Sequence, residues 1–208
     1  VARFSPDNGK ILVVSGDRVA VYDHTPNGPE RRHELGGGWW VFGAAFSPDS
    51  SRVLTWARDA KAQIWDLESG GLALPPLEHQ HGVQRAEFSA DGRFILTVSR
   101  DQSVRIWNAA SGKLACSPLR KLGPTSHLAA RISPDRKRLL ISQAGHTRLY
   151  DLSTSELAGP LILGAGIKRV GFVGEREYLL TVNQDNAVQV WDPARGRDPA
   201  RRRLPAPA

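Results

Sequence analysis

The sequence predicts an all-β repeat protein, and three observations carry this prediction. A turn motif that begins as Phe4-Ser5-Pro6-Asp7 recurs after 42, 42, 44 and 40 residues, and its last copy is degenerate. A second motif, an aromatic residue followed by a carboxylate or its amide, keeps step with the first. Between the motifs, short segments alternate polar and apolar residues as half-buried strands do. Two motifs in one register make chance a poor explanation, so we expect five repeated units.

Each copy of the turn motif contains an acidic residue, and turn formation accounts for its presence. Its copies are Phe4–Asp7, Phe46–Asp49, Phe88–Asp91, Ile132–Asp135 and Phe172–Glu175. The aromatic pairs are Tyr22-Asp23, Trp65-Asp66, Trp107-Asn108, Tyr150-Asp151 and Trp191-Asp192. The recurring Asp of the turn could be mistaken for part of a catalytic carboxylate pair. Because Asp readily accepts hydrogen bonds from a local turn, a turn-forming role accounts for every copy, and catalysis accounts for none.

The third unit is the most complete and gives the expected order of elements. Alternation and β-branched content predict four strands, at 84–88, 93–99, 103–107 and 113–119. The first two are joined by a tight turn at Ser89-Ala90-Asp91-Gly92, and the last ends near a proline. Four short antiparallel strands per unit, with no helical periodicity, are typical of a β-propeller blade. We place the array at 1–192, with units at about 1–35, 36–77, 78–119, 120–161 and 162–192.

The units resemble WD40 repeats, in which a Trp-Asp pair ends the third strand. The resemblance covers residues 1–192. The string Leu74-Pro75-Pro76-Leu77, followed by Phe-Ser-x-Asp-Gly, is similar to WD40 arrays of large bacterial multidomain proteins. In that group the arrays can follow a protein-kinase domain, although this sequence contains no kinase motif. The resemblance implies a propeller whose loops bind partners at one face.

The resemblance also implies an internal hydrogen-bond relay, which the third unit alone matches throughout. The matching residues are His81, Thr97 or Ser99, Asp101 and Trp107. Such a relay is structural, because a buried indole N–H, hydroxyl and imidazole all need partners. We expect His79 to be a solvated loop residue. The pair His79 and His81 could chelate a metal, but no third ligand is nearby, so we expect no metal site.

The most unusual local string is Gly36-Gly37-Gly38-Trp39-Trp40, just before an inner strand. Adjacent tryptophans cannot both point inward along a strand, so one is a candidate aromatic anchor for a partner. The alternative, that both pack within the loop, stays open. Several basic residues at repeated positions could converge on one mouth and bind an acidic peptide or phosphate, or could simply be solvated. The candidate contact residues are Trp39, Trp40, Arg58, Arg85, Arg100 and Lys168.

Charge and cysteine content narrow the function class further. The formal net charge is +7, and five Arg against one Asp in the tail 193–208 contribute +4 of it. This tail could contact nucleic acid or anionic lipid, but no aromatic residues interleave with its arginines, so we expect a linker or solvated segment. The single cysteine, Cys116, has no His or acidic residue near it in the sequence, which predicts an inert thiol. No apolar run approaches the roughly 20 residues that span a bilayer, and we expect a cytoplasmic location.

We therefore expect a non-enzymatic scaffold without a cofactor that binds a protein or peptide partner. The alternative is a regulatory or substrate-docking module of a larger enzyme, such as a bacterial serine/threonine protein kinase. A catalytic propeller would need convergent acid/base or metal groups, and the sequence supplies none. The chain starts with Val1 inside a repeat and contains no Met, so we expect further linked repeats or domains. Four outer strands for five sets of inner strands predict a partial propeller, or one not closed by strand exchange.

Overall fold

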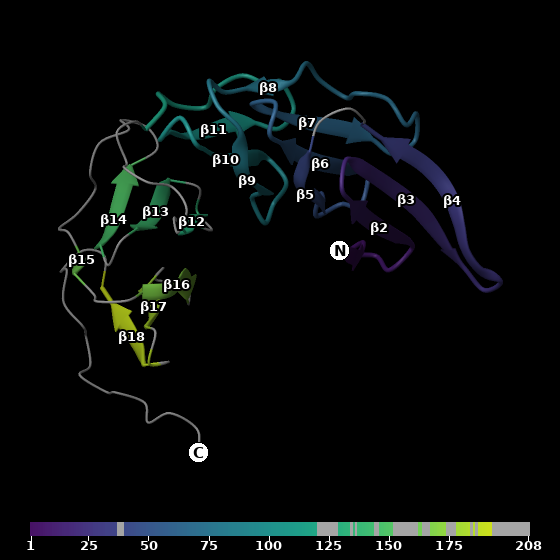
Figure 1. Ribbon diagram of the computed structural model, residues 1–208. Helices are drawn as coiled ribbons and strands as arrows, with labels where there is room; N and C mark the ends of the chain where they lie inside the picture. Colours follow the sequence, from purple (N-terminus) through teal and green to yellow (C-terminus); the bar gives the residue numbers. More distant parts are fainter. Residues whose placement is uncertain are drawn as a thin grey trace. The chain divides into compact units, whose positions relative to one another are not determined.

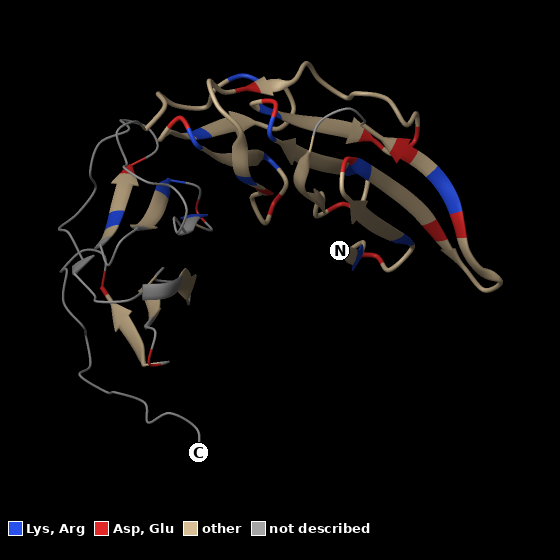
Figure 2. Cartoon of the chain, in the orientation of Figure 1, with Lys and Arg blue, Asp and Glu red and all other residues tan. Residues whose placement is uncertain are grey.

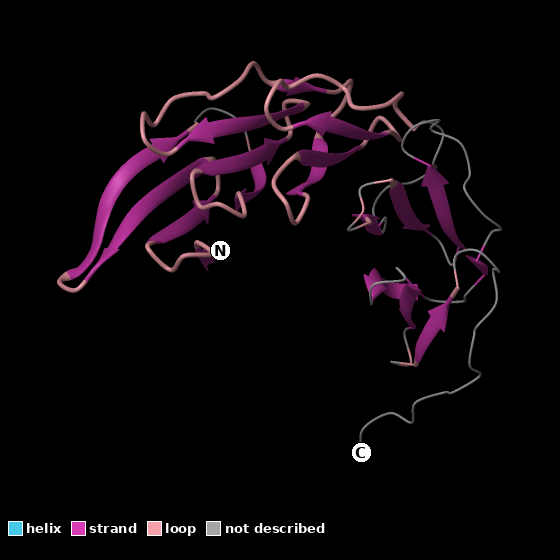
Figure 3. Ribbon diagram, turned by 180° about the vertical axis from the view of Figure 1, so that it is seen from behind, coloured by secondary structure: helices cyan, strands magenta, loops and turns pink. Residues whose placement is uncertain are grey.

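The computed structural model describes residues 1–36, 40–119, 129–133, 135, 137–143, 146–151, 162–163, 167–173, 178–183, 185 and 187–192. These residues form strands, turns and loops, with no helix among them (Figures 1 and 3). The strands make five antiparallel sheets, and no sheet in this part of the chain closes on itself. The predicted all-β fold of repeated antiparallel units, as in a partial propeller, is confirmed. The chain divides into two units, Val1–Gly123 and Pro124–Ala208, and each is described by itself.

The first unit contains three sheets whose strands pair in sequence order. The first sheet holds β1 (Ala2–Phe4), β2 (Lys10–Ser15), β3 (Arg18–Thr25) and β4 (Gly28–Leu35). The second sheet holds β5 (Val41–Phe46), β6 (Arg52–Ala57), β7 (Lys61–Asp66) and β8 (Leu77–Glu78). The third sheet holds β9 (Val83–Phe88), β10 (Phe94–Ser99) and β11 (Val104–Asn108).

The second unit repeats this arrangement in two sheets. The fourth sheet holds β12 (Ala129–Ile132), β13 (Arg138–Gln143), β14 (His146–Asp151) and β15 (Ile162–Leu163). The fifth sheet holds β16 (Ile167–Val173), β17 (Tyr178–Asn183) and β18 (Val188–Trp191). Since β15 pairs with β14, the fourth sheet extends past the unit boundary predicted at residue 161. The tail predicted at 193–208 lies outside the described residues.

The repeated turn has the same hydrogen bonds in the first four sheets. In the first sheet, Ser5 Oγ donates to Asp7 Oδ1 at 2.5 Å and accepts the backbone N–H of Lys10 at 2.9 Å. The Asp7 carboxylate also accepts the backbone N–H of Gly9 at 3.0 Å. The same three bonds recur at Ser47 with Asp49, Ser89 with Asp91 and Ser133 with Asp135. The recurring Asp therefore forms turns, as predicted.

Neighbouring sheets of the first unit pack face to face in a repeated way. Successive side chains of a strand point to opposite faces, so each sheet can present one face to the sheet before it and one to the sheet after it. The core between the first and second sheets includes Leu12, Val19, Val21, Leu35, Ala44, Val53 and Leu67. The core between the second and third includes Leu54, Ala62, Ile64, Leu77, Ala86, Ile95 and Trp107. This packing fixes the positions of the loops at both ends of the strands.

The outer strands differ most among the sheets, and one of them was predicted wrongly. In the first sheet, β4 runs for 8 residues and forms a long hairpin with β3 (Figure 1). In the second sheet, β8 has only 2 residues. In the third, the strand predicted at 113–119 is reduced to isolated bridges at Leu114 and Leu119. Prolines explain the shortening, because Pro118, like Pro75 and Pro76 before β8, has no N–H for a strand ladder.

Candidate functional site

A buried hydrogen-bond network crosses the third sheet. His79 Nε2 lies 2.7 Å from Thr97 Oγ1, and that oxygen also accepts the indole N–H of Trp107 at 2.8 Å. On its other side, His79 Nδ1 lies 3.1 Å from Asp101 Oδ2. The network therefore links the segment before β9 to β10, to β11 and to the turn between them.

The prediction that His81 is the relay residue is wrong, because His79 occupies that position. His79 is buried, whereas the His81 side chain is exposed and only its backbone oxygen bonds to Ser99 Oγ, at 2.6 Å. The strand alternation of β8 explains the choice. Leu77 is buried and Glu78 exposed, and the backbone N–H of His79 still bonds to Ala60 O at 2.8 Å. His79 thus falls on the same inward face as Leu77.

The hydroxyl that the sequence left open between two residues is that of Thr97. Ser99 instead donates to the backbone oxygens of His81 and Gly82, and accepts the backbone N–H of Asp101 at 3.1 Å. Both hydroxyls lie on one strand two residues apart, but Thr97 is the one within reach of the Trp107 indole. Ser99 therefore belongs to the turn and not to the indole network.

Burial decides the charge state of the network. Desolvation, followed by the nearby Arg105 guanidinium, lowers the pKa of His79 to about 4. At neutral pH the imidazole is therefore uncharged, so its Nδ1–H donates to Asp101 and its Nε2 accepts the Thr97 hydroxyl proton. Burial alone would raise the pKa of Asp101, but hydrogen bonds from Ser103 and the Gln80 backbone, together with His79, hold it well below its usual range.

The network is structural even though it pairs a His with an Asp. The two hydroxyls that contact His79 belong to Thr97 and Ser103, which are 0% and 1% exposed. A substrate could not reach either oxygen without opening the sheet. Asp101 is fully occupied as well, because it accepts hydrogen bonds from His79, the Gln80 backbone and both the N–H and hydroxyl of Ser103. The arrangement satisfies buried polar groups and fixes the turn before β11.

Part of the network recurs wherever the third strand ends in Trp. Trp65 donates to Thr55 at 2.9 Å, and Trp191 donates to Thr181 at 3.0 Å. The residue at the Thr position is apolar in the two sheets that carry Tyr instead, namely Val13 beside Tyr22 and Ile141 beside Tyr150. An indole N–H needs an acceptor inside the sheet, and Tyr at this position places no N–H there.

A second group of residues lies where the inner strands β5 and β9 begin, and three of its members, Trp40, Arg58 and Arg100, are exposed. Trp40 is 65% exposed, and its backbone oxygen accepts the N–H of Arg58 at 3.0 Å. Gly82 O accepts the N–H of Arg100 at 3.0 Å. The Arg100 guanidinium carbon lies 5.2 Å from the centre of the Phe42 ring. We call these five residues, Trp40, Phe42, Arg58, Gly82 and Arg100, the aromatic–arginine end.

Three of the six predicted contact residues meet at this end: Trp40, Arg58 and Arg100. Arg85 does not join them, because its guanidinium pairs with Glu87 at 3.0 Å. Lys168 lies in β16 of the second unit, where the structure describes its backbone but not its side chain. Trp39 lies outside the described residues.

The sequence analysis missed Phe42 and Gly82. Gly82 is required by close packing, since a Cβ there would lie 3.2 Å from Arg58 O and 3.4 Å from Phe42 Cε2. A glycine two residues before a predicted inner strand was the available signal, because it marks a place where another backbone comes close. Phe42 carried no signal of its own, since its partner Arg100 comes from the next repeat.

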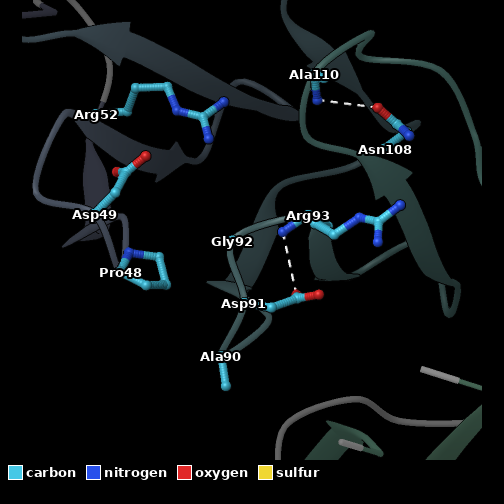
Figure 4. Close-up of a pocket in the computed structure, with 9 residues that line it drawn as sticks. All are labelled: Pro48, Asp49, Arg52, Ala90, Asp91, Gly92, Arg93, Asn108 and Ala110. Atoms are coloured by element: carbon cyan, nitrogen blue, oxygen red, sulfur yellow. Dashed lines mark hydrogen bonds between the residues drawn. The ribbon is translucent and has the colours of Figure 1, made fainter. Parts of the chain in front are cut away.

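At the opposite end of the same strands, acidic and basic residues line a groove. A groove of about 590 Å³ lies there between the turns of the second and third sheets, and Figure 4 shows its lining residues. Asp49 and Arg52 line one side of this groove and Asp91 and Arg93 line the other, so its formal charges balance. Several of these groups already hold the chain together. Arg52 Nη1 donates to Ala109 O at 2.8 Å, and the Ser47 hydroxyl, as the main cause, lowers the pKa of Asp49 to about 2.

Within the described ranges, no three His, Cys, Asp or Glu side chains lie close enough together to hold a metal ion. The same ranges contain no helix long and apolar enough to cross a bilayer.

Comparison with known proteins identifies one repeat directly. Residues 76–108 match the family model of the WD domain, G-beta repeat (WD40). The matched segment runs from the start of β8 through β11 and contains His79, Thr97, Asp101 and Trp107. No curated protein matches the chain. Residues 76–108 are therefore similar to a WD40 repeat, and the five antiparallel sheets are consistent with an array of such units.

Proposed function

We propose that this protein is a non-catalytic scaffold that binds a partner protein through the aromatic–arginine end. A WD40 repeat suggests a protein-interaction role in general. One observation carries the choice of surface: Trp40 is 65% exposed while its backbone is fixed to Arg58. A large aromatic side chain whose backbone is held by a hydrogen bond loses little entropy on binding, and exposed Trp and Arg dominate many protein interfaces.

The state of the polar residues supports a non-catalytic role. The recurring Asp residues are used in turns, and the one described His–Asp pair is buried within a sheet. Catalysis requires a nucleophile, acid or base that substrate can reach. The exposed feature of the first unit is instead a set of aromatic and guanidinium groups, which suits recognition.

Partner capture with a Trp40→Ala variant tests this proposal. The purified chain would be immobilised, exposed to lysate of its source and analysed by mass spectrometry. Leu72→Ala is the matched control, because Leu72 is also an exposed apolar residue, at 46%, but lies in the connection between β7 and β8. We expect Trp40→Ala to lose partners that Leu72→Ala retains, with unchanged circular dichroism for both. Retention of every partner by Trp40→Ala would contradict the proposal.

Two predictions from the sequence remain predictions. The similarity to bacterial multidomain arrays suggests that the array is a regulatory or docking module of a larger enzyme, such as a serine/threonine protein kinase. Reading the intact open reading frame for a glycine-rich loop, a strand lysine and a catalytic-loop Asp tests this alternative. Fractionation of source cells tests the cytoplasmic location.

A further inference from the structure

Arg58 and Arg100 hold the same position in consecutive repeats. Each directly precedes the Asp in the turn between the second and third strands of its sheet, Asp59 or Asp101. Their backbones meet through Gly82. The oxygen of Gly82 accepts the N–H of Arg100, and a Cβ on Gly82 would lie 3.3 Å from Arg58 Cα. The two arginines are therefore neighbours across the packed second and third sheets, although 42 residues separate them in the chain.

The Arg100 side chain is oriented before any partner binds. Its guanidinium carbon lies 5.2 Å from the centre of the Phe42 ring, an interaction between a cation and the face of an aromatic ring. Phe42 belongs to β5 of the second sheet, two residues after Trp40. The contact therefore directs the Arg100 guanidinium away from its own sheet and toward the strand that begins beside Trp40.

These two arginines differ from others on the first unit in lacking an acidic partner. Arg31, Arg32 and Arg85 pair with the carboxylates Glu34, Asp23 and Glu87. In the described part of the chain, no carboxylate pairs with the guanidinium of Arg58 or Arg100. Figure 2 shows the contrast on β4, where acidic and basic residues lie side by side.

The carboxylates nearest in sequence do not neutralise this pair. Asp101 is buried and bonded to His79, the Gln80 backbone and Ser103. Asp59 accepts the backbone N–H of Lys61 at 3.2 Å. Within the described ranges, the exposed Trp40 thus lies at the same end as Arg58 and Arg100, and neither guanidinium group has a carboxylate partner there.

We propose that the partner of this surface is an acidic protein segment, with an Asp or Glu carboxylate bound by Arg58 and Arg100 and an adjacent apolar side chain against Trp40. The proposal rests on the proposed function and names the chemistry of the partner. A guanidinium group presents paired N–H donors that match the two oxygens of a carboxylate, so two such groups recognise one or two acidic side chains. Phe42 reduces the ordering cost for Arg100, because that side chain is already positioned.

Fluorescence anisotropy with short labelled peptides tests the proposal. The probe peptide alternates Glu and Gly around one Leu, and two further peptides carry Gln or phosphoserine in place of Glu. The protein is the full chain with Arg201, Arg202 and Arg203 changed to Gln, so that the tail does not bind the probe. We expect saturable, salt-sensitive binding of the Glu peptide and no binding of the Gln peptide. Arg58→Gln and Arg100→Gln should each weaken binding about tenfold, the size expected for loss of a charge-assisted hydrogen bond.

Arg93→Gln is the matched control, since Arg93 is exposed at the opposite end of the sheets. It should change the affinity less than about twofold, a size typical of a solvated charge distant from the site. Equal binding of the Glu and Gln peptides, or unchanged binding by the Arg58 and Arg100 variants, overturns the proposal, as does binding of the phosphoserine peptide alone. If the Glu peptide fails while Trp40→Ala still loses captured partners, the acidic partner is wrong and the scaffold function stands.

Discussion

The first and third sheets follow the same strand order and the same turn, yet they hold their third strand in different ways. In the third sheet, Trp107 is joined to Thr97 and His79 inside the sheet, while the outer segment makes only isolated bridges. In the first sheet, Tyr22 lies beside Val13, and the 8 residues of β4 pair along β3. One repeat frame is thus stabilised either by a buried polar network or by a long edge strand.

The second sheet resembles the third sheet in how it holds its third strand. Its outer strand β8 is short, and Trp65 donates to Thr55 as Trp107 does to Thr97. A short outer strand therefore accompanies an internal hydrogen bond in both sheets. In the first unit, the two sheets with a short outer segment carry the indole hydrogen bond, and the sheet without that bond carries the long edge strand.

The largest effect on stability should come from replacing Thr97 by Val, the residue that the first sheet has at this position as Val13. Thr97→Val keeps the side-chain shape but leaves the Trp107 indole N–H and His79 Nε2 buried without a partner. We expect a loss of about 3 kcal/mol of unfolding free energy, since each unsatisfied buried group costs about 1–3 kcal/mol. Urea denaturation followed by tryptophan fluorescence measures it.

The reverse change, Val13→Thr, is the matched control in the first sheet. It adds a hydroxyl where Tyr22 offers no indole N–H, and removes no existing hydrogen bond. We expect a cost of about 1 kcal/mol or less, because Val13 is only half-buried and the hydroxyl can reach water. Equal costs for the two substitutions would show that the network does not stabilise the third sheet.

Acid should weaken the third sheet through His79, for which the first sheet has no counterpart. Burial lowers the pKa of His79 from 6.5 to about 4, so the unfolded chain binds a proton there at a higher pH than the folded chain. The stability from neutral His79 is therefore complete above pH 6.5 and is lost as the pH falls toward 4. Urea midpoints at pH 7 and 4.5 should reveal a loss of about 1–2 kcal/mol.

Two histidine variants isolate this effect. His79→Gln should remove the decline between pH 7 and 4.5, because no imidazole then titrates inside the sheet. His81→Gln should keep the decline, since the His81 side chain lies outside the network. An unchanged pH dependence in His79→Gln would assign the acid sensitivity to other groups.

The choice between His79 and His81 also shows how much of the structure could be predicted from the sequence. Sequence spacing predicted the turns and the sheets, because these depend on local periodicity. The WD40 resemblance implied Asp101 and Trp107 as partners and left the choice between Thr97 and Ser99 open. It misplaced the imidazole, because whether alternation continues past Glu78 depends on the bond from His79 to Ala60 in the previous turn. It could not find Phe42 for the same reason, since the ring that orients Arg100 comes from the neighbouring repeat.

The smallest effect on stability should come from changes to the turn that the first and third sheets share. Ser5→Ala and Ser89→Ala each remove the hydroxyl that donates to the turn Asp and accepts a backbone N–H. Each should cost about 1 kcal/mol, the usual net contribution of such hydrogen bonds, and the two costs should agree within error in urea denaturation. A clearly larger cost for Ser89 would mean that the turn and the His79 network act as one cooperative unit in the third sheet. Equal costs would mean that the turn is independent of whichever device stabilises the third strand, so that the repeat frame tolerates both.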